Sequence, residues 1–331
     1  MNRDSSIKPI KLVYILAASH SGSTLLAMLL SSHPEVFTAG ELKANSLGNA
    51  DDYLCSCKRR INECPFWICI RSEMNSRGFP LDFKNPRTDF MSVSSRYARW
   101  LLKPLHRGYC VENLRECALF LSPIWRKEEK MIRRKNIELI QCLLDLSGKR
   151  IIVDSSKIGL RLKYLQKIDE LDIYVLRLIR DGRSVALTYM DPARFADAMD
   201  PALRGVGTDS QRLSERLSMK EAAYEWKRSN EEADCILRQF NSNRWMEVRY
   251  EELCRSPNIV LAELAKFIEV DARKISLNFR SNETHVIGNG MRLDDHSDIR
   301  FDERWKNQLT AADLNTFDAI AGRLNRRLGY Q

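Results

Sequence analysis

The stretch from residue 11 to residue 33 constrains the fold of this 331-residue chain more than any other. Residues 11–18 read KLVYILAA, a short apolar run rich in β-formers, which predicts a buried strand. Residues 24–33 read TLLAMLLSSH and predict a helix, which ends where Pro34 follows. Only small or polar residues separate the two elements, so the strand must turn directly into the helix.

This turn matches a phosphate-binding loop except at its lysine. Against the pattern G-x-x-x-x-G-K-[ST], Gly22 and Thr24 match, Ala17 replaces the first glycine, and Ser23 replaces the lysine. The small residues still allow backbone N–H groups to surround a phosphate at the positive end of a helix. The missing lysine is the group that reaches β- and γ-phosphates, so a single 5′-phosphate group fits better than a triphosphate. A plain strand-to-helix turn without a ligand remains open from this stretch alone.

The rest of the chain alternates between strands and helices. Further strands are predicted at 150–154, 172–180 and 244–250, and helices within 91–147 and at 158–170, 184–190 and 218–240, with two or three more after them. This alternation implies a mostly parallel sheet covered by helices, in which ligands bind beyond the carboxyl ends of the strands. Residues 44–90 are predicted to be irregular, and residues 193–216 to form a mobile loop region.

Composition sets broad limits. The chain is 44% hydrophobic and 29% charged, which is ordinary for a globular protein. Its net charge of +9 suggests an anionic ligand, an anionic surface or nucleic acid without choosing among them. The first residues do not form a secretory signal, and no apolar run approaches the ~18 residues of a membrane span. We therefore expect a cytoplasmic protein whose nine cysteines are mostly thiols.

A second phosphate-binding pattern follows the strand predicted at 172–180. Arg180 ends that strand, and Thr188 lies eight residues later, two turns into the next helix. An arginine fork and a hydroxyl that converge on one group suit a dianionic phosphate. Arg183, in the same stretch, either contacts phosphate or merely occupies the first helical turn.

These motifs together resemble the sulfotransferases that use 3′-phosphoadenosine-5′-phosphosulfate (PAPS). Residues 19–43, SHSGSTLLAMLLSSHPEVFTAGELK, look like their 5′-phosphosulfate loop, commonly R-S-G-[ST]-[ST]-L, and most resemble a bacterial branch with H-S-G-S-T-L-L. His20 stands in place of the arginine. Arg180 and Thr188 have the layout of the family's 3′-phosphate signature, with threonine in place of serine.

The resemblance implies an α/β fold, a P-loop NTPase-like three-layer sandwich with a central, mostly parallel sheet and helical insertions. It implies a single domain over residues 1–331, in which an irregular and helical insertion at about 44–147 shapes the acceptor site.

The resemblance also implies the catalytic residues. Glu41 lies in a segment similar to that of protein-tyrosine sulfotransferases, in which the glutamate acts as base. Lys157 takes the place of a lysine that bridges the sulfuryl group and the leaving oxygen. Ser155 and Ser156 could hydrogen-bond the same oxygens, and Lys43 is a weaker electrostatic candidate.

His33 is a rival base, because cytosolic sulfotransferases use a histidine. Theirs lies on a different segment, far down the chain. The position of His33 before Pro34, at a helix end, is more typical of a cap.

Segments near the C-terminus complete the predicted donor site. VRYEEL, at 248–253, resembles the family's strand-end R-Y-E-D-L, where Tyr250 either contacts the nucleotide or packs in the core. GNGMR, at 288–292, resembles the segment that closes over the 3′-phosphate. Trp305 and Lys306 belong to a D-E-x-W-K stretch that the bacterial branch shares, and receive no role. The predicted donor-binding residues are Ser19, His20, Ser21, Gly22, Ser23, Thr24, Leu25, Arg180, Thr188, Tyr250, Gly290 and Arg292.

Four cysteines cluster within CSCKRRINECPFWIC: Cys55, Cys57, Cys64 and Cys69. Their spacing, C-x-C-x6-C-x4-C, is not a standard zinc pattern. Free thiols, a disulfide and a metal site all remain open. The bacterial branch seems to share C-x-C…C-P-F-W, which implies a structural clip near the acceptor entrance.

The predicted function is transfer of a sulfuryl group from PAPS to a hydroxyl or amine by in-line displacement, leaving adenosine 3′,5′-bisphosphate. The acceptor is a small molecule, carbohydrate or peptide, with no nucleic-acid partner and no membrane span. No metal is expected, because no polyphosphate must be neutralised. One alternative is a nucleotide kinase-like enzyme, which Ser23 disfavours. Another is a non-catalytic module for anionic ligands or nucleic acid, which the basic residues within 126–135 motivate.

Overall fold

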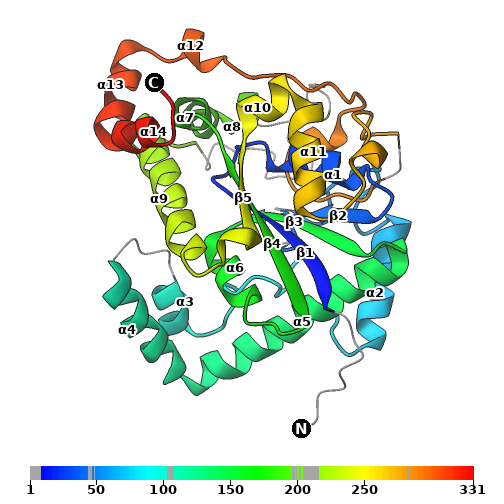
Figure 1. The fold of residues 1–331 in the computed structure, drawn as a ribbon. Coiled ribbons are helices and arrows are strands. Elements are labelled where there is room, and N and C mark those ends of the chain that lie inside the picture. Colours follow the sequence, from blue (N-terminus) through cyan, green and yellow to red (C-terminus); the bar gives the residue numbers. More distant parts are fainter. Residues whose placement is uncertain are drawn as a thin grey trace.

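The computed structural model describes residues 9–43, 47, 49–102, 108–195, 198, 200, 203, 216–281 and 284–331. Its centre is a five-stranded sheet in which all neighbouring strands are parallel (Figure 1). In spatial order the strands are β2 (Val36–Gly40), β3 (Ile151–Lys157), β1 (Ile10–Ala17), β4 (Leu171–Ile179) and β5 (Trp245–Arg249). The predicted α/β fold and the four predicted strands are confirmed.

Helices and short helical turns connect the strands and cover both faces of the sheet. The α-helices are α1 (Ser23–Ser31), α2 (Pro65–Ser76), α3 (Arg96–Leu102), α4 (Gly108–Phe120), α5 (Pro123–Ser147), α6 (Gly159–Leu165), α7 (Gly182–Met190), α8 (Pro192–Phe195), α9 (Met219–Leu237), α10 (Tyr250–Arg255), α11 (Pro257–Phe267), α12 (Trp305–Gln308), α13 (Ala311–Phe317) and α14 (Arg323–Arg327). The short turns are η3 (Ser242–Arg244), η4 (Ala272–Lys274), η5 (Gly290–Leu293) and the π-helical η6 (Asp318–Gly322). None of these described helices combines the length and hydropathy of a membrane span.

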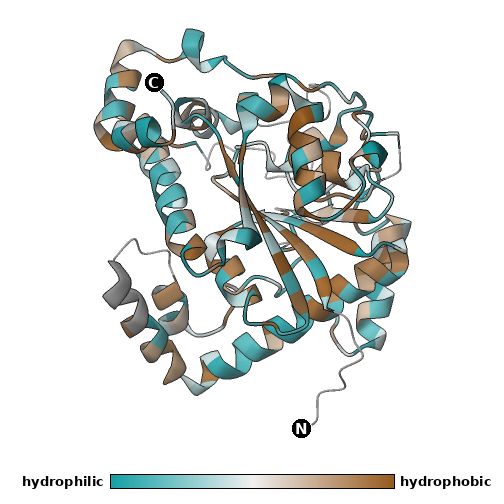
Figure 2. Ribbon diagram, viewed as in Figure 1, coloured by the Kyte–Doolittle hydropathy of each residue, from teal (hydrophilic) through white to brown (hydrophobic). Residues whose placement is uncertain are grey.

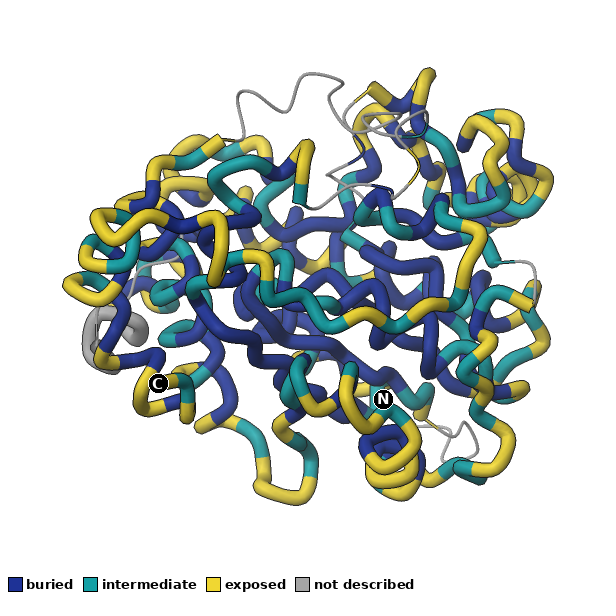
Figure 3. The backbone as a smooth tube through the Cα atoms, turned by 90° about the horizontal axis from the view of Figure 1, so that it is seen from above, coloured by how far each residue is buried: buried dark blue, intermediate teal, exposed yellow. Residues whose placement is uncertain are grey.

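Strand β1 shows how the sheet separates the core into two layers. Because side chains alternate along a strand, Leu12 and Tyr14 pack in one apolar cluster with residues of α2, α5 and α6. Val13 and Ile15 pack in another, with residues of α1, α10 and α11. The central strands are rich in hydrophobic residues (Figure 2), and exposed residues gather at the periphery around a buried centre (Figure 3). A third apolar cluster joins α7, α9, α13 and α14.

Several local predictions were wrong. Residues 44–90 are not wholly irregular, because α2 begins at Pro65 and buries Trp67, Ile70 and Met74 at helical spacing. Strand β2, between the first helix and Glu41, is absent from the strands that the sequence predicted. The helix predicted at 158–170 ends at Leu165.

The last part of the chain forms α10 to α14, more helices than expected. Most of the loop predicted at 193–216 lies outside the described residues, which there comprise the end of α8 and residues 198, 200, 203 and 216. The single-domain organisation stays a prediction.

A fully buried ion pair between Asp154 and Arg161 joins the segments around the sheet's carboxyl edge. Asp154 Oδ2 accepts from Arg161 Nε at 2.9 Å, and Asp154 Oδ1 accepts from the backbone N–H of Leu42 at 3.3 Å. The other guanidinium nitrogens of Arg161 donate to the carbonyl of Thr88 and to the side chain of Asn136 on α5, each at 2.7 Å. The Asp154 carboxylate and the Arg161 guanidinium are therefore each hydrogen-bonded to more than one group, as buried charges require.

Removing one partner of this pair should be severely destabilising. Arg161→Met leaves the Asp154 carboxylate buried without its cation, which costs about 3–5 kcal/mol of unfolding free energy. Lys84→Met, which breaks an exposed pair with Asp51, should leave the free energy of unfolding nearly unchanged. Urea denaturation of both variants measures the difference, and equal losses would contradict this account.

Candidate active site

A cavity of about 960 Å³ opens at the carboxyl edge of the sheet. All five strands deliver a lining residue at or just beyond their ends: Ser19 after β1, Glu41 after β2, Lys157 at the end of β3, Arg180 after β4 and Tyr250 after β5. The arrangement agrees with the rule that parallel α/β sheets bind ligands at this edge. Of the predicted site residues, the cavity is lined by Ser19, His20, Gly22, Ser23, Thr24, Leu25, Glu41, Lys157, Arg180, Thr188 and Tyr250.

The loop between β1 and α1 has the backbone of an anion cradle. His20 and Gly22 both adopt the left-handed conformation, with φ of 64° and 92°. The N-cap residue of α1, Gly22, has no side chain to cap the helix, which leaves the first N–H groups of this nine-residue helix to a ligand. A Cβ at Gly22 would lie 2.6 Å from Tyr250 Cδ2, so both the backbone conformation and the packing require glycine here.

Arg180 binds this loop and closes one side of the cavity. Its Nη1 donates to the carbonyl of His20 at 2.7 Å, and its Nη2 donates to Ser184 Oγ at 2.6 Å. The guanidinium stacks over the ring of Tyr250, with its Cζ 4.3 Å from the ring centroid. Nη2 also pairs with Asp302 Oδ2 at 2.9 Å, so a carboxylate already shares the positive charge of Arg180.

Thr188 lines the cavity, but its hydroxyl donates to the carbonyl of Ser184 at 3.0 Å. The hydroxyl that contacts Arg180 is that of Ser184, one helical turn before Thr188. Sequence reasoning missed Ser184, although its position four residues after Arg180 was a usable signal. It also missed Asp302, which is 122 residues away and had no local signal.

Glu41 and Lys157 form a nearly buried ion pair inside the cavity. Lys43 Nζ lies 3.5 Å from the other carboxylate oxygen. Burial alone would raise the pKa of Glu41, but the ammonium groups of Lys157 and Lys43 outweigh burial and lower that pKa to about 2. Burial lowers the pKa of Lys157, and Glu41 opposes this shift. Lys157 also has a positive φ of 71°, a costly conformation for a lysine that is found at functional sites.

The structure places three predicted donor-binding residues outside the described lining of the cavity. Ser21 and Gly290 are buried. Arg292 is buried as well, and its guanidinium donates to the carbonyls of Leu54 and Gly288 at 2.6–3.0 Å. Arg292 therefore holds loops together in this structure, and Asn289 and Met291 line the cavity in its place.

Other candidates also make structural contacts. His33 is fully buried outside the described lining, and its Nδ1 accepts from the backbone N–H of Glu35 at 3.1 Å, as a turn cap does. Ser156 accepts from the backbone N–H of Lys43 at 3.1 Å and donates to Asp154.

Ser155 is buried outside the described lining. Arg183 pairs with Asp181 at 2.7 Å and stacks on Trp305, so it belongs to the first helical turn rather than to the cavity.

A comparison with protein-family models gives a match over most of the chain. The model of the sulfotransferase family matches residues 13–274. The sulfotransferase domain from the curacin biosynthetic pathway has a similar structure, with a TM-score of 0.50 and 18% identity over 98% of this chain and 99% of that one. The sulfotransferase domain of the Synechococcus PCC 7002 olefin synthase has a TM-score of 0.49 and 17% identity over 100% and 98%. No curated protein matches the chain significantly. At such identities the structural likeness concerns the fold alone.

The Glu41–Lys157 pair should make stability depend on acid pH. Because the folded-state pKa of Glu41, about 2, is below the usual 4.5, the pair contributes stability above pH 4.5 that is lost as the pH falls towards 2. Lys157→Met removes the main cause of the lowered pKa, so its free energy of unfolding should fall less over this range than that of the wild type. Denaturant unfolding at about pH 5.5, 4.5 and 3.5 measures both slopes. Identical slopes would contradict the assigned pairing.

Proposed function

This chain belongs to the sulfotransferase family, and on this premise we propose that it transfers a sulfuryl group from PAPS to a hydroxyl or amine acceptor by in-line displacement. The observation that carries the proposal is the convergence of an anion cradle, an arginine and a carboxylate–ammonium pair in one cavity. Sulfuryl transfer, like phosphoryl transfer, depends mainly on alignment and on stabilisation of charge at the leaving group.

The donor's 5′ end is assigned to the cradle, where the uncapped N-terminus of α1 offers backbone donors and a positive dipole. Ser23 and Thr24 add hydroxyl groups at the same place. The 3′-phosphate is assigned to Arg180 and Thr188. A phosphate on Arg180 competes with the Asp302 carboxylate, which accepts from the same Nη2.

Glu41 is assigned as the base and Lys157 as the cation at the leaving oxygen. The acceptor oxygen or nitrogen attacks sulfur, the bond from sulfur to the 5′-phosphate oxygen breaks, and Glu41 takes the acceptor's proton. A carboxylate with a pKa of about 2 is a weak base while it is paired. The negative charge of a bound donor attracts the Lys157 ammonium, which weakens its hold on Glu41 and raises the pKa of Glu41 towards its usual value.

The acceptor side is assigned to the insertion at about 44–147, because it packs beside the cavity edge through Thr88, whose hydroxyl donates to the carbonyl of Lys43 at 2.6 Å. A small molecule, a carbohydrate and a peptide remain the acceptor classes, since a fold does not set a substrate. The proposal keeps the enzyme in the cytoplasm, where cysteines stay reduced.

Adenosine 3′,5′-bisphosphate should stabilise the protein without magnesium. A ligand at 100 times its dissociation constant adds about 2.7 kcal/mol to the unfolding free energy, so the melting temperature should rise. ATP with magnesium should give a smaller shift, because Ser23 replaces the lysine that binds the outer phosphates. Differential scanning fluorimetry with each ligand tests this, and a larger shift with magnesium ATP would favour a kinase instead.

Glu41→Gln should lower kcat by about 10²–10⁴-fold, because it removes the base while keeping the shape of the side chain. Its affinity for adenosine 3′,5′-bisphosphate should stay within about threefold of the wild type, since the cradle and Arg180 are unchanged. Transfer of labelled sulfate from PAPS to a pooled acceptor library, read by mass spectrometry, gives the activity. The matched control is Glu303→Gln, another cavity-lining carboxylate, which pairs with Lys306 and should retain activity. Near-normal turnover by Glu41→Gln would refute the assigned role.

A further inference from the structure

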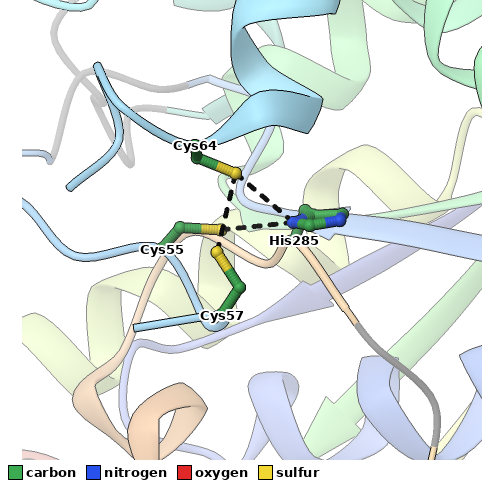
Figure 4. Close-up of side chains that lie close together, drawn as sticks. All are labelled: Cys55, Cys57, Cys64 and His285. Atoms are coloured by element: carbon green, nitrogen blue, oxygen red, sulfur yellow. Dashed lines mark hydrogen bonds between the residues drawn. The ribbon is translucent and has the colours of Figure 1, made fainter. Parts of the chain in front are cut away.

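Three cysteines and one histidine, none of them among the residues described as lining the cavity, point their ligand atoms at a common centre (Figure 4). Cys55, Cys57 and Cys64 come from one loop, and His285 comes from a segment more than 220 residues later. Their three sulfur atoms and one ring nitrogen all lie within 4.8 Å of one another. No role in sulfuryl transfer has been assigned to any of the four.

The spacing of these atoms is that of a tetrahedral metal site. Bonds of 2.3 Å from zinc to sulfur and about 2.05 Å to nitrogen place the ligands of a regular tetrahedron about 3.8 Å apart for two sulfurs and about 3.6 Å apart for sulfur and nitrogen. Here Cys57 Sγ lies 3.6 Å from Cys64 Sγ. His285 Nδ1 lies 3.8 Å from Cys55 Sγ and 3.4 Å from Cys64 Sγ.

A disulfide accounts for these residues less well. Bonded sulfurs lie about 2.05 Å apart, whereas Cys55, Cys57 and Cys64 are all free thiols in this structure. A disulfide between any two of them would also not explain why the third sulfur and the His285 nitrogen lie at the same point. The fourth clustered cysteine, Cys69, is exposed on α2 and does not join the group.

The surrounding residues hold the four side chains in place. Cys55 begins a tight turn in which the N–H of Lys58, in the left-handed conformation, donates to the carbonyl of Cys55 at 2.8 Å. The ring of Phe66 stacks on that of His285, with 4.4 Å between centroids and 8° between planes. Ser56 Oγ accepts from the backbone N–H of Val286 at 2.8 Å, which fixes the cysteine loop beside the histidine segment.

We propose that Cys55, Cys57, Cys64 and His285 bind one structural zinc ion. Thiolate and imidazole are the donors that zinc prefers, and a Cys₃His set is one of its common structural forms. Four protein ligands fill the tetrahedron and leave no position for water or substrate, so the ion acts on structure rather than on the sulfuryl group. A structural zinc ion is compatible with the expectation that sulfuryl transfer itself needs no metal. The zinc site does not depend on which acceptor the protein uses.

The ion would anchor one wall of the catalytic cavity. Two residues after His285, Ile287 accepts from the backbone N–H of Glu41 at 3.1 Å and donates to the carbonyl of Ala39 at 2.9 Å. The next residue, Gly288, donates to the hydroxyl of Tyr53 at 2.7 Å and lines the cavity. Zinc would therefore tie the cysteine loop to the strand-like segment that positions Glu41.

Metal analysis of the untagged, full-length protein tests the proposal. After expression in zinc-supplemented medium and gel filtration, inductively coupled plasma mass spectrometry should find one zinc per chain. Cys57→Ser and His285→Ala should reduce bound zinc to background, whereas Cys69→Ser should retain it. Removing zinc from the wild type with a strong chelator should lower its melting temperature, and adding Zn²⁺ should restore it.

X-ray absorption at the zinc edge of the wild-type protein keeps the test independent of whether the variants fold. Three sulfur neighbours and one nitrogen neighbour are expected. A shell of oxygen and nitrogen only, a protein without zinc that remains fully stable, or an intact mass two hydrogens lower because of a disulfide would each overturn the proposal. Loss of zinc in Cys69→Ser would overturn the ligand assignment.

Discussion

The buried pair of Asp154 and Arg161 is the interaction on which the arrangement of the active edge depends. Asp154 lies on β3, three residues before Lys157, and accepts from the backbone N–H of Leu42, the neighbour of Glu41. One carboxylate therefore fixes the relative positions of the two segments that carry the candidate base and its cation. Arg161 extends the network to α5. A buried charge with several partners permits few alternative geometries, which is what a site that works by alignment needs.

A second set of contacts lies beside Glu41, where loops far apart in the chain are fixed to one another. Arg292 binds the carbonyl of Leu54, and its guanidinium lies over the ring of Tyr53 with 4.2 Å to the centroid. Gly40 shows how closely the backbones approach here, since a Cβ at this position would meet the carbonyl oxygen of Ile287 at 1.9 Å. The buried ion pair and these loop contacts together fix the edge of the sheet where Glu41 and Lys157 meet.

Local sequence patterns predicted the sheet well because its central strands are continuous apolar runs, as fully buried parallel strands are. They missed β2, whose five residues carry too little pattern to be recognised without its partner β3. They placed Lys157 and Arg180 at strand ends and Glu41 after the first helix, and the structure brings these three residues into one cavity. Local sequence patterns could not predict contacts between segments that are far apart in the chain. Asp302 at Arg180 is an example, as is His285 at the cysteines, because nothing near either residue marks its partner.

The strand order has a consequence for how the chain acquires its structure during synthesis. Strand β1 lies at the centre of the sheet, and its two neighbours begin at Ile151 and Leu171. During synthesis β1 therefore has no partner in the sheet until the chain has been extended to β3 and β4. Parallel pairings between such distant segments form slowly, and an unpaired apolar strand is prone to aggregation while it waits. Since the candidate phosphate-binding loop directly follows β1, it acquires its native support only after β3 and β4 have been synthesised.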